Sequence, residues 1–167
     1  MKRGELPLPD EDDLADKYAL ADGLLRGQGL DWYEVSNWSR RGHECRHNVA
    51  YWVGDDWWGF GPGAHSHVGG VRFWNAKHPR SYGSALAAGH SPAAGRERLG
   101  AEDRRIERVL LELRLRRGLP EEVLTPAERR RVPGLERRGW LVRERGSVRV
   151  TDAGRLLADA AVRELLD

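Results

Sequence analysis

The most constraining feature of this 167-residue chain is the segregation of its histidines and tryptophans. All six histidines and six of the seven tryptophans lie between Trp32 and His90. After about residue 100, apolar residues instead recur at helical spacing between arginines. The contrast predicts two units, with a candidate site in residues 1–95 and a helical module in residues 96–167.

Composition limits the class of protein further. A single cysteine excludes an internal disulfide and any cluster that needs several thiolates from this chain. No run approaches the roughly 20 apolar residues of a membrane span, and no apolar stretch follows the basic N-terminus as in a secretory signal. We therefore expect a cytoplasmic protein. The aperiodic segment from Gly89 to Gly100 is the expected joint between the two units.

The first unit is predicted to contain short helices and strands. Leu14, Tyr18 and Leu25 share one face of a helix over residues 10–28, which begins with four acidic residues. Irregular chain is expected over residues 37–51. The other expected elements are strands over residues 32–36, 57–60 and 71–75 and a helix over residues 79–88.

The second unit has a clearer pattern, and its order of elements is that of a winged-helix module. Thr125 and Pro126 form an N-cap followed by proline at the first helical position, and Pro133-Gly134 is expected to break or re-angle that helix before Leu135. Residues 140–142 and 148–150 flank a hairpin turn. Two further helices are expected over residues 102–117 and 152–166.

A glycine-rich loop follows the expected strand at residues 57–60. Gly59, Gly61 and Gly63 would let backbone N–H groups approach an anion closely. The loop lacks the Lys-Ser/Thr of a P-loop, and its spacing differs from the dinucleotide fingerprint. The alternative is a tight turn between a strand and a helix.

Two groups of histidine and cysteine residues are spaced in a way that could suit a metal site. His43, Cys45 and His47 lie two residues apart, and His65 and His67 repeat that spacing. Imidazole and thiolate together suit zinc or iron. A site needs three or four ligands that converge, however, and a lone cysteine is usually a small buried apolar residue.

A flat aromatic ligand is the third possibility. His47 stands in a segment with Tyr51 and Trp52, and Trp57, Trp58 and Trp74 follow, so an imidazole is combined with several broad rings. This set suits a planar, partly apolar ligand such as a porphyrin, with Arg41 or Arg46 available for its carboxylates. The alternative is a tryptophan-rich core with hydrogen-bonded histidines.

The same stretch resembles a known family. An HNxxYW signature (His47, Asn48, Tyr51 and Trp52) and the GxGPGAHS loop that follows it are similar to the radical-SAM, oxygen-independent coproporphyrinogen III oxidase-like proteins, and specifically to their heme chaperone branch. The similarity continues into the second half, which resembles the family's C-terminal HemN-type domain. It implies an α+β chain that consists of the terminal βα units of a partial TIM-type barrel followed by a winged-helix-like domain.

The resemblance also implies ligands and partners. In the family, a CxxxCxxC motif holds a [4Fe-4S] cluster with S-adenosylmethionine, and this chain has only Cys45 outside that motif. We therefore expect a C-terminal part of a longer protein that neither binds the cluster nor catalyses by itself, with the N-terminal radical-SAM half as a partner. The resemblance makes His47, Asn48, Tyr51 and Trp52 the heme-binding candidates. It also implies that the protein delivers heme to membrane hemoproteins and lies at the periphery of the membrane.

The resemblance also implies a position for the glycine loop in the fold. The resemblance puts Gly59, Gly61, Gly63 and His65 at the mouth of the barrel, near the cofactor. A truncated barrel would also leave the strand over residues 32–36 with an unpaired, tryptophan-rich edge.

Two other functions remain open from the sequence. One is nucleic-acid binding by the winged-helix-like half, through the arginines of residues 129–138 and of the hairpin at residues 143–149. Interleaved glutamates and a formal charge of only +4 over residues 96–167 argue against it. The other is a residual chain without independent activity.

Overall fold

A computed structural model describes residues 10–167, in which helices and short strands are interspersed. The first half contains α1 (Glu11–Gly27), β1 (Asp31–Glu34), β2 (Asn37–Ser39), α2 (Arg46–Trp52), β3 (His65–Val68), β4 (Val71–Asn75), α3 (Pro79–Ala87) and β5 (Ala93–Arg98). The second half contains α4 (Ala101–Glu112), β6 (Leu119–Pro120), α5 (Pro126–Arg137), β7 (Leu141–Glu144), β8 (Ser147–Val150) and α6 (Ala158–Leu166). The α+β class is confirmed.

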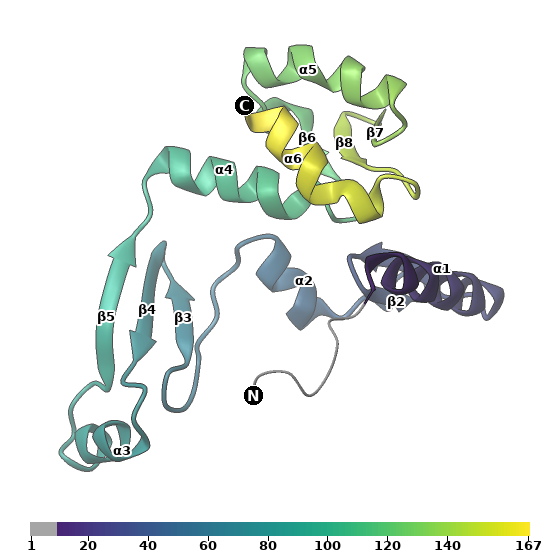
Figure 1. Ribbon diagram of the computed structural model, residues 1–167. Coiled ribbons are helices and arrows are strands. Elements are labelled where there is room, and N and C mark those ends of the chain that lie inside the picture. Colours follow the sequence, from purple (N-terminus) through teal and green to yellow (C-terminus); the bar gives the residue numbers. More distant parts are fainter. Residues whose placement is uncertain (1–9) are drawn as a thin grey trace.

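The second half is a winged-helix-like module with the main hydrophobic core. Its strands form an antiparallel sheet in the order β6-β8-β7, and α4, α5 and α6 pack around it (Figure 1). Arg145 and Gly146, with φ of 52° and 81°, make the tight β7–β8 turn. Thirteen of the fourteen residues in the buried cluster come from this half, between Val109 and Leu165.

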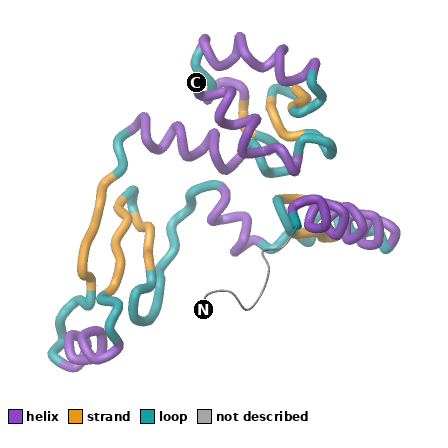
Figure 2. Tube along the Cα trace, viewed as in Figure 1, coloured by secondary structure: helices purple, strands orange, loops and turns teal. Residues whose placement is uncertain are grey.

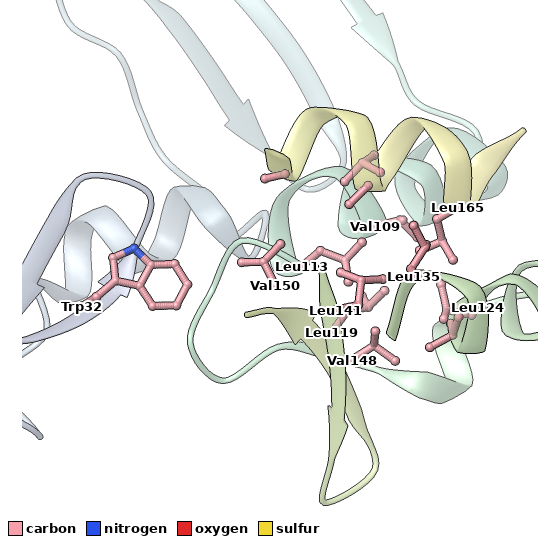
Figure 3. Packing of buried hydrophobic residues seen from close by; sticks show 14 residues of the cluster. Trp32, Val109, Leu113, Leu119, Leu124, Leu135, Leu141, Val148, Val150 and Leu165 are labelled. Carbon is pink, nitrogen blue, oxygen red and sulfur yellow. The ribbon is translucent and has the colours of Figure 1, made fainter. Parts of the chain in front are cut away.

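The fourteenth residue of that core comes from β1. Trp32 is only 4% exposed, and Figure 3 shows its ring at the edge of the cluster, on the side of Val150 and Leu113. The backbone N–H of Arg116 donates to the carbonyl of Tyr33 at 2.9 Å, so the two halves also share a main-chain hydrogen bond. The expected tryptophan-rich edge is wrong for Trp32, because its indole is buried against the module, whereas β1 pairs with β2 alone and no strand of the described residues lies along its other edge.

A second antiparallel sheet, in the order β3-β4-β5, forms the other end of the molecule. In Figure 1, α4 leads from this sheet to the winged-helix-like module, and α3 lies at the far end of the sheet. The aperiodic segment after Gly89 is not a linker, because Ala93–Arg98 forms strand β5 on the edge of β4. The predicted division at residue 95 thus falls inside a strand.

The region between β1 and β3 differs most from its prediction. The chain expected to be irregular contains β2 and the helix α2, and a long loop joins α2 to β3 (Figure 2). The strand expected over residues 57–60 is reduced to one bridge, in which Trp57 and His67 exchange backbone hydrogen bonds of 2.7 and 2.9 Å. The last three residues of the loop predicted over residues 59–67 instead belong to strand β3.

The helices confirm most of the expected boundaries. Thr125 caps α5: its hydroxyl accepts from the N–H of Glu128, and its own N–H donates to the Glu128 carboxylate. Of the two outcomes predicted at Pro133, a break is wrong: α5 continues to Arg137, because Val132 and Leu135 on either side are buried in the core. The last helix begins later than expected, at Ala158, after a turn in which the Thr151 hydroxyl accepts from the N–H of Gly154. Within residues 10–167, no helix combines the length and the apolar character of a membrane span.

Candidate functional site

The helix α2, which carries the HNxxYW residues, is anchored to β1 by a single side chain. The amide of Asn48 donates to a carboxylate oxygen of Glu34 at 2.8 Å and to the Tyr33 hydroxyl at 3.3 Å. Glu34 is only 2% exposed, and the same oxygen accepts from the amide of Asn37. A buried carboxylate needs such donors to be tolerated. Asn48 is therefore a positioning residue that fixes α2 against the hairpin.

A row of four aromatic rings runs from α2 to strand β3. His47 meets the edge of Tyr51, Tyr51 meets Trp57, and Trp57 meets His67, each with 5.0 Å between ring centroids. Tyr51 lies one helical turn after His47, so both project from the same side of α2. His47 is exposed at the open end of the row, which leaves its imidazole accessible to a ligand.

His67 lies at the buried end of this row. It is 7% exposed, its Nδ1 lies 3.2 Å from the carbonyl of Asp55, and its Nε2 has no hydrogen-bond partner. The sequence offered His67 only as half of a possible metal-ligating pair with His65, and not as part of an aromatic row with α2. Its two-residue spacing from His65 puts both on one face of β3, but the contact with Trp57 depends on the long loop and has no sequence signal.

The remaining HNxxYW and loop residues are more dispersed. Trp52 lines a small cleft of about 220 Å³ together with Tyr51, Trp57 and His67. His65 is exposed on β3 and stacks on Trp74, with ring centroids 5.8 Å apart. The structure thus brings Tyr51 and Trp52 together with His67, and places His65 against the strand β4.

The backbone N–H groups of the glycine loop hold it in place by donating hydrogen bonds to other parts of the protein. The N–H of Gly59 donates to the Ser66 hydroxyl at 3.0 Å, that of Gly61 to the Tyr82 hydroxyl at 3.1 Å, and that of Gly63 to the carbonyl of Ala76 at 3.0 Å. These three N–H groups are therefore engaged within the protein, which is the arrangement of a tight turn. Position 59 requires glycine, because a Cβ there would overlap the carbonyl oxygen of His65.

The described residues do not fit an iron–sulfur cluster. Cys45 is the single cysteine of the chain and is exposed at the N-cap of α2. Across residues 10–167, no three histidine, cysteine, aspartate or glutamate side chains group closely enough to hold a metal ion. A [4Fe-4S] cluster held by a CxxxCxxC motif takes three thiolates, which the single cysteine of this chain does not supply.

The arginines of the winged-helix-like half are largely engaged within it. Arg143 pairs with Glu136 at 2.8 Å, and Arg138 pairs with Glu164. Arg129 donates to the carbonyls of Glu121 and Glu122 at 3.1 Å. Nucleic-acid binding relies on cations that are free to meet phosphates, and these pairings argue against it.

The chain has close relatives among heme chaperones. No family model matches it. It is 51% identical over 166 residues to the heme chaperone HemW of Mycobacterium tuberculosis, a match that covers 99% of this chain and 43% of that protein. It is 28% identical over 167 residues to the heme chaperone HemW of Bacillus subtilis, covering 95% of this chain and 44% of that protein. The chain thus spans less than half the length of these relatives.

A solved structure shares the fold. The coproporphyrinogen III oxidase HemN of Escherichia coli, described as a radical-SAM enzyme, superposes with a TM-score of 0.70 over 97% of this chain and 43% of its own length, at 16% identity. The sequence matches identify this chain as the counterpart of the C-terminal part of the heme chaperones named HemW, and it shares its fold with part of a radical-SAM coproporphyrinogen III oxidase.

Proposed function

We propose that this chain binds heme, as the C-terminal part of a HemW-like chaperone, for delivery to membrane hemoproteins. The supporting observation is the exposed imidazole of His47, held on a short helix that Asn48 fixes to a buried carboxylate. An imidazole is a common axial ligand of heme iron. Tyr51 and Trp52, the other residues of the signature, contribute aromatic surface beside it.

The proposal includes a protein partner for the exposed apolar surface of the first half. Among residues 10–98, the buried hydrophobic side chains are Trp32 and Tyr33. The other buried side chains in this range are polar or charged. Trp58 and Phe60 are 59% and 83% exposed. A large exposed apolar surface of this kind is typical of an interaction site. We assign it to a radical-SAM half, which would carry the cluster and S-adenosylmethionine and face the loop of Gly59, Gly61, Gly63 and His65.

The division into a unit of residues 1–95 and one of residues 96–167 is part of the same proposal, with β5 crossing the boundary. Delivery of heme to membrane acceptors would place the protein in the cytoplasm, peripheral to the membrane.

The experiment is a heme titration of the purified chain, followed by absorbance in the Soret region. Wild type is expected to saturate at one heme per chain, and His47→Ala is expected to bind at least about tenfold more weakly. His90→Ala is the matched control, because His90 is also exposed but lies after α3, outside the aromatic row. Equal, non-saturating binding by all three proteins would refute the proposal.

A further inference from the structure

The small cleft at the buried end of the aromatic row lies between β3 and α4. Its volume is about 220 Å³, and its walls include His67, Trp57 and the α4 residues Arg104, Glu107, Arg108 and Leu111. Pockets for drug-sized ligands have volumes of roughly 300–1,000 Å³. The cleft therefore suits a small ion or a molecule of a few heavy atoms.

The buried polar group in this cleft is the imidazole of His67. Its Nδ1 lies 3.2 Å from the carbonyl of Asp55. Because a carbonyl oxygen only accepts, Nδ1 carries the proton of the neutral ring, and Nε2 keeps its lone pair. Among residues 10–167, Nε2 has no hydrogen-bond partner, although His67 is only 7% exposed. A buried acceptor without a partner costs free energy, so this nitrogen favours a ligand that donates a hydrogen bond.

Two cations of α4 line the same cleft. Arg104 and Arg108 lie one helical turn apart, so their side chains are neighbours on one face of the helix. Arg104 donates one N–H to the carbonyl of Leu99 at 2.7 Å, and Arg108 donates its Nε–H to Glu112 at 2.6 Å. The other N–H groups of the two guanidinium groups have no acceptor within residues 10–167. They are available to an anion.

The carboxylate in the wall of the cleft does not oppose an anion. Glu107 accepts from both Nη groups of Arg72 at 2.6 Å, and this bidentate pair compensates its charge. With three arginines and one glutamate in its walls, the cleft has a formal charge of +2. A complementary ligand is therefore negatively charged and also carries a proton that it can donate.

We propose that this cleft binds the hydrogen phosphate ion. Its P–OH group donates to Nε2 of His67, and its unprotonated oxygens accept from Arg104 and Arg108. Sulfate has a similar size and the same charge but no proton, and a phosphate monoester loses its last proton near about pH 6. Inorganic phosphate keeps one proton at pH 8. The lone pair of His67 thus selects inorganic phosphate over both other anions.

The test is isothermal titration calorimetry of the full chain at pH 8, above the ordinary pKa of a histidine side chain, with ionic strength held constant by chloride. The titrants are inorganic phosphate, sulfate and glycerol 3-phosphate. Phosphate is expected to saturate at one ion per chain, and each of the other two anions to bind at least about tenfold more weakly. Equal affinities for phosphate and sulfate, or no saturable phosphate binding, overturn the proposal.

Two variants test the two parts of the site. His67→Phe keeps an aromatic ring beside Trp57 and removes the acceptor, so phosphate should bind about tenfold more weakly and lose its advantage over sulfate. Arg104→Ala should weaken the binding of both anions by the same factor, about fivefold. Arg130→Ala is the matched control, because it removes one charge from an exposed position on α5, outside the walls of the cleft. It is expected to bind phosphate as wild type does.

The site is separate from the proposed heme ligand, since Tyr51 and Trp57 lie between His47 and His67 in the aromatic row. His47→Ala is therefore expected to bind phosphate as wild type does. If phosphate binds as described while heme binding ignores His47, the anion site stands and the proposed heme ligand fails.

A folding defect in His67→Phe does not end the test. In wild type, the ¹⁵N resonance of Nε2 of His67 should shift when phosphate is added and stay in place when sulfate is added. His67→Gln retains an acceptor in its side-chain amide and should keep part of the preference for phosphate over sulfate. An Nε2 resonance that does not respond to phosphate, or wild-type affinity in Arg104→Ala, overturns the proposal.

Discussion

Arg155 and Asp22 lie 133 residues apart in the sequence and form a two-pronged ion pair, with nitrogen–oxygen distances of 3.0 and 2.7 Å. The pair joins α1 to the turn before α6, and the Arg155 guanidinium also lies over the rings of Trp32 and Tyr18, at 5.0 and 5.4 Å. Trp38 donates its indole N–H to the same carboxylate at 2.6 Å. The first segment of the chain is thus attached to the winged-helix-like module by charge as well as by the buried indole of Trp32.

This ion pair makes stability depend on acid pH. The hydrogen bond from Arg155, aided by that from Trp38, lowers the pKa of Asp22 from 3.8 to about 2. A carboxyl whose folded pKa is depressed stabilises the protein above its unfolded pKa, and that contribution is lost as the pH falls through the folded value. Asp22→Asn is therefore expected to be less stable than wild type at pH 7, and the difference should shrink between about pH 4 and pH 2.

Urea unfolding followed by tryptophan fluorescence measures this difference. Asp16→Asn, at an exposed position on the same helix, is the control and should unfold like wild type at each pH. A gap between wild type and Asp22→Asn that stays constant down to pH 2 would show that the ion pair is not the source.

The indole of Trp32 carries the apolar part of the same attachment. Trp32→Ala should lower the free energy of unfolding by about 3–5 kcal/mol, since it leaves a cavity at the edge of the main core. Trp58→Ala, at a 59% exposed site, should cost less than about 1 kcal/mol. Thermal unfolding compares the two, and limited proteolysis should release α1 to β2 faster from the Trp32 variant. Similar losses for both variants would contradict the docking of β1.

The Asn48 anchor should matter for the position of α2. Asn48→Ala leaves the buried carboxylate of Glu34 with one donor fewer, so a loss of about 1–3 kcal/mol is expected. Asn48→Asp should be worse at neutral pH, because it sets a second carboxylate against Glu34. Chemical unfolding at pH 7 gives both values. An Asn48→Asp protein as stable as wild type would mean that the contact with Glu34 does not hold the helix.

The glycine loop offers a steric prediction. Gly59→Ala should destabilise the protein by about 1–3 kcal/mol, because the added methyl group meets the backbone carbonyl of His65. Gly83 lies in α3 with open space around its Cβ position, and Gly83→Ala should be neutral or slightly stabilising. Differential scanning calorimetry of the two variants tests the contrast, and equal melting temperatures would argue against the tight turn.

Local signals in the sequence were enough to predict much of the winged-helix-like half. Thr125 and Pro126 mark the start of α5, and Arg145-Gly146 lies at the expected hairpin turn. The end of α5 was not predictable, because Pro133 is tolerated only where Val132 and Leu135 are buried by distant elements. Local propensity could not reveal that tertiary contribution.

The candidate site was predictable only in part. The HNxxYW residues were found from the sequence, and they do form a helix beside aromatic rings. The partners Glu34, Trp57 and His67 come from a hairpin, a loop and a strand, and nothing local links them to α2.

The measurement that tests the central claim most directly is the absorption spectrum of ferric heme bound to wild type and to His47→Ala, each with and without added imidazole. If His47 ligates the iron, the variant should show a shifted Soret band, and free imidazole should restore the wild-type spectrum. Identical spectra for the two proteins, unchanged by imidazole, would contradict the assignment of heme to the HNxxYW helix.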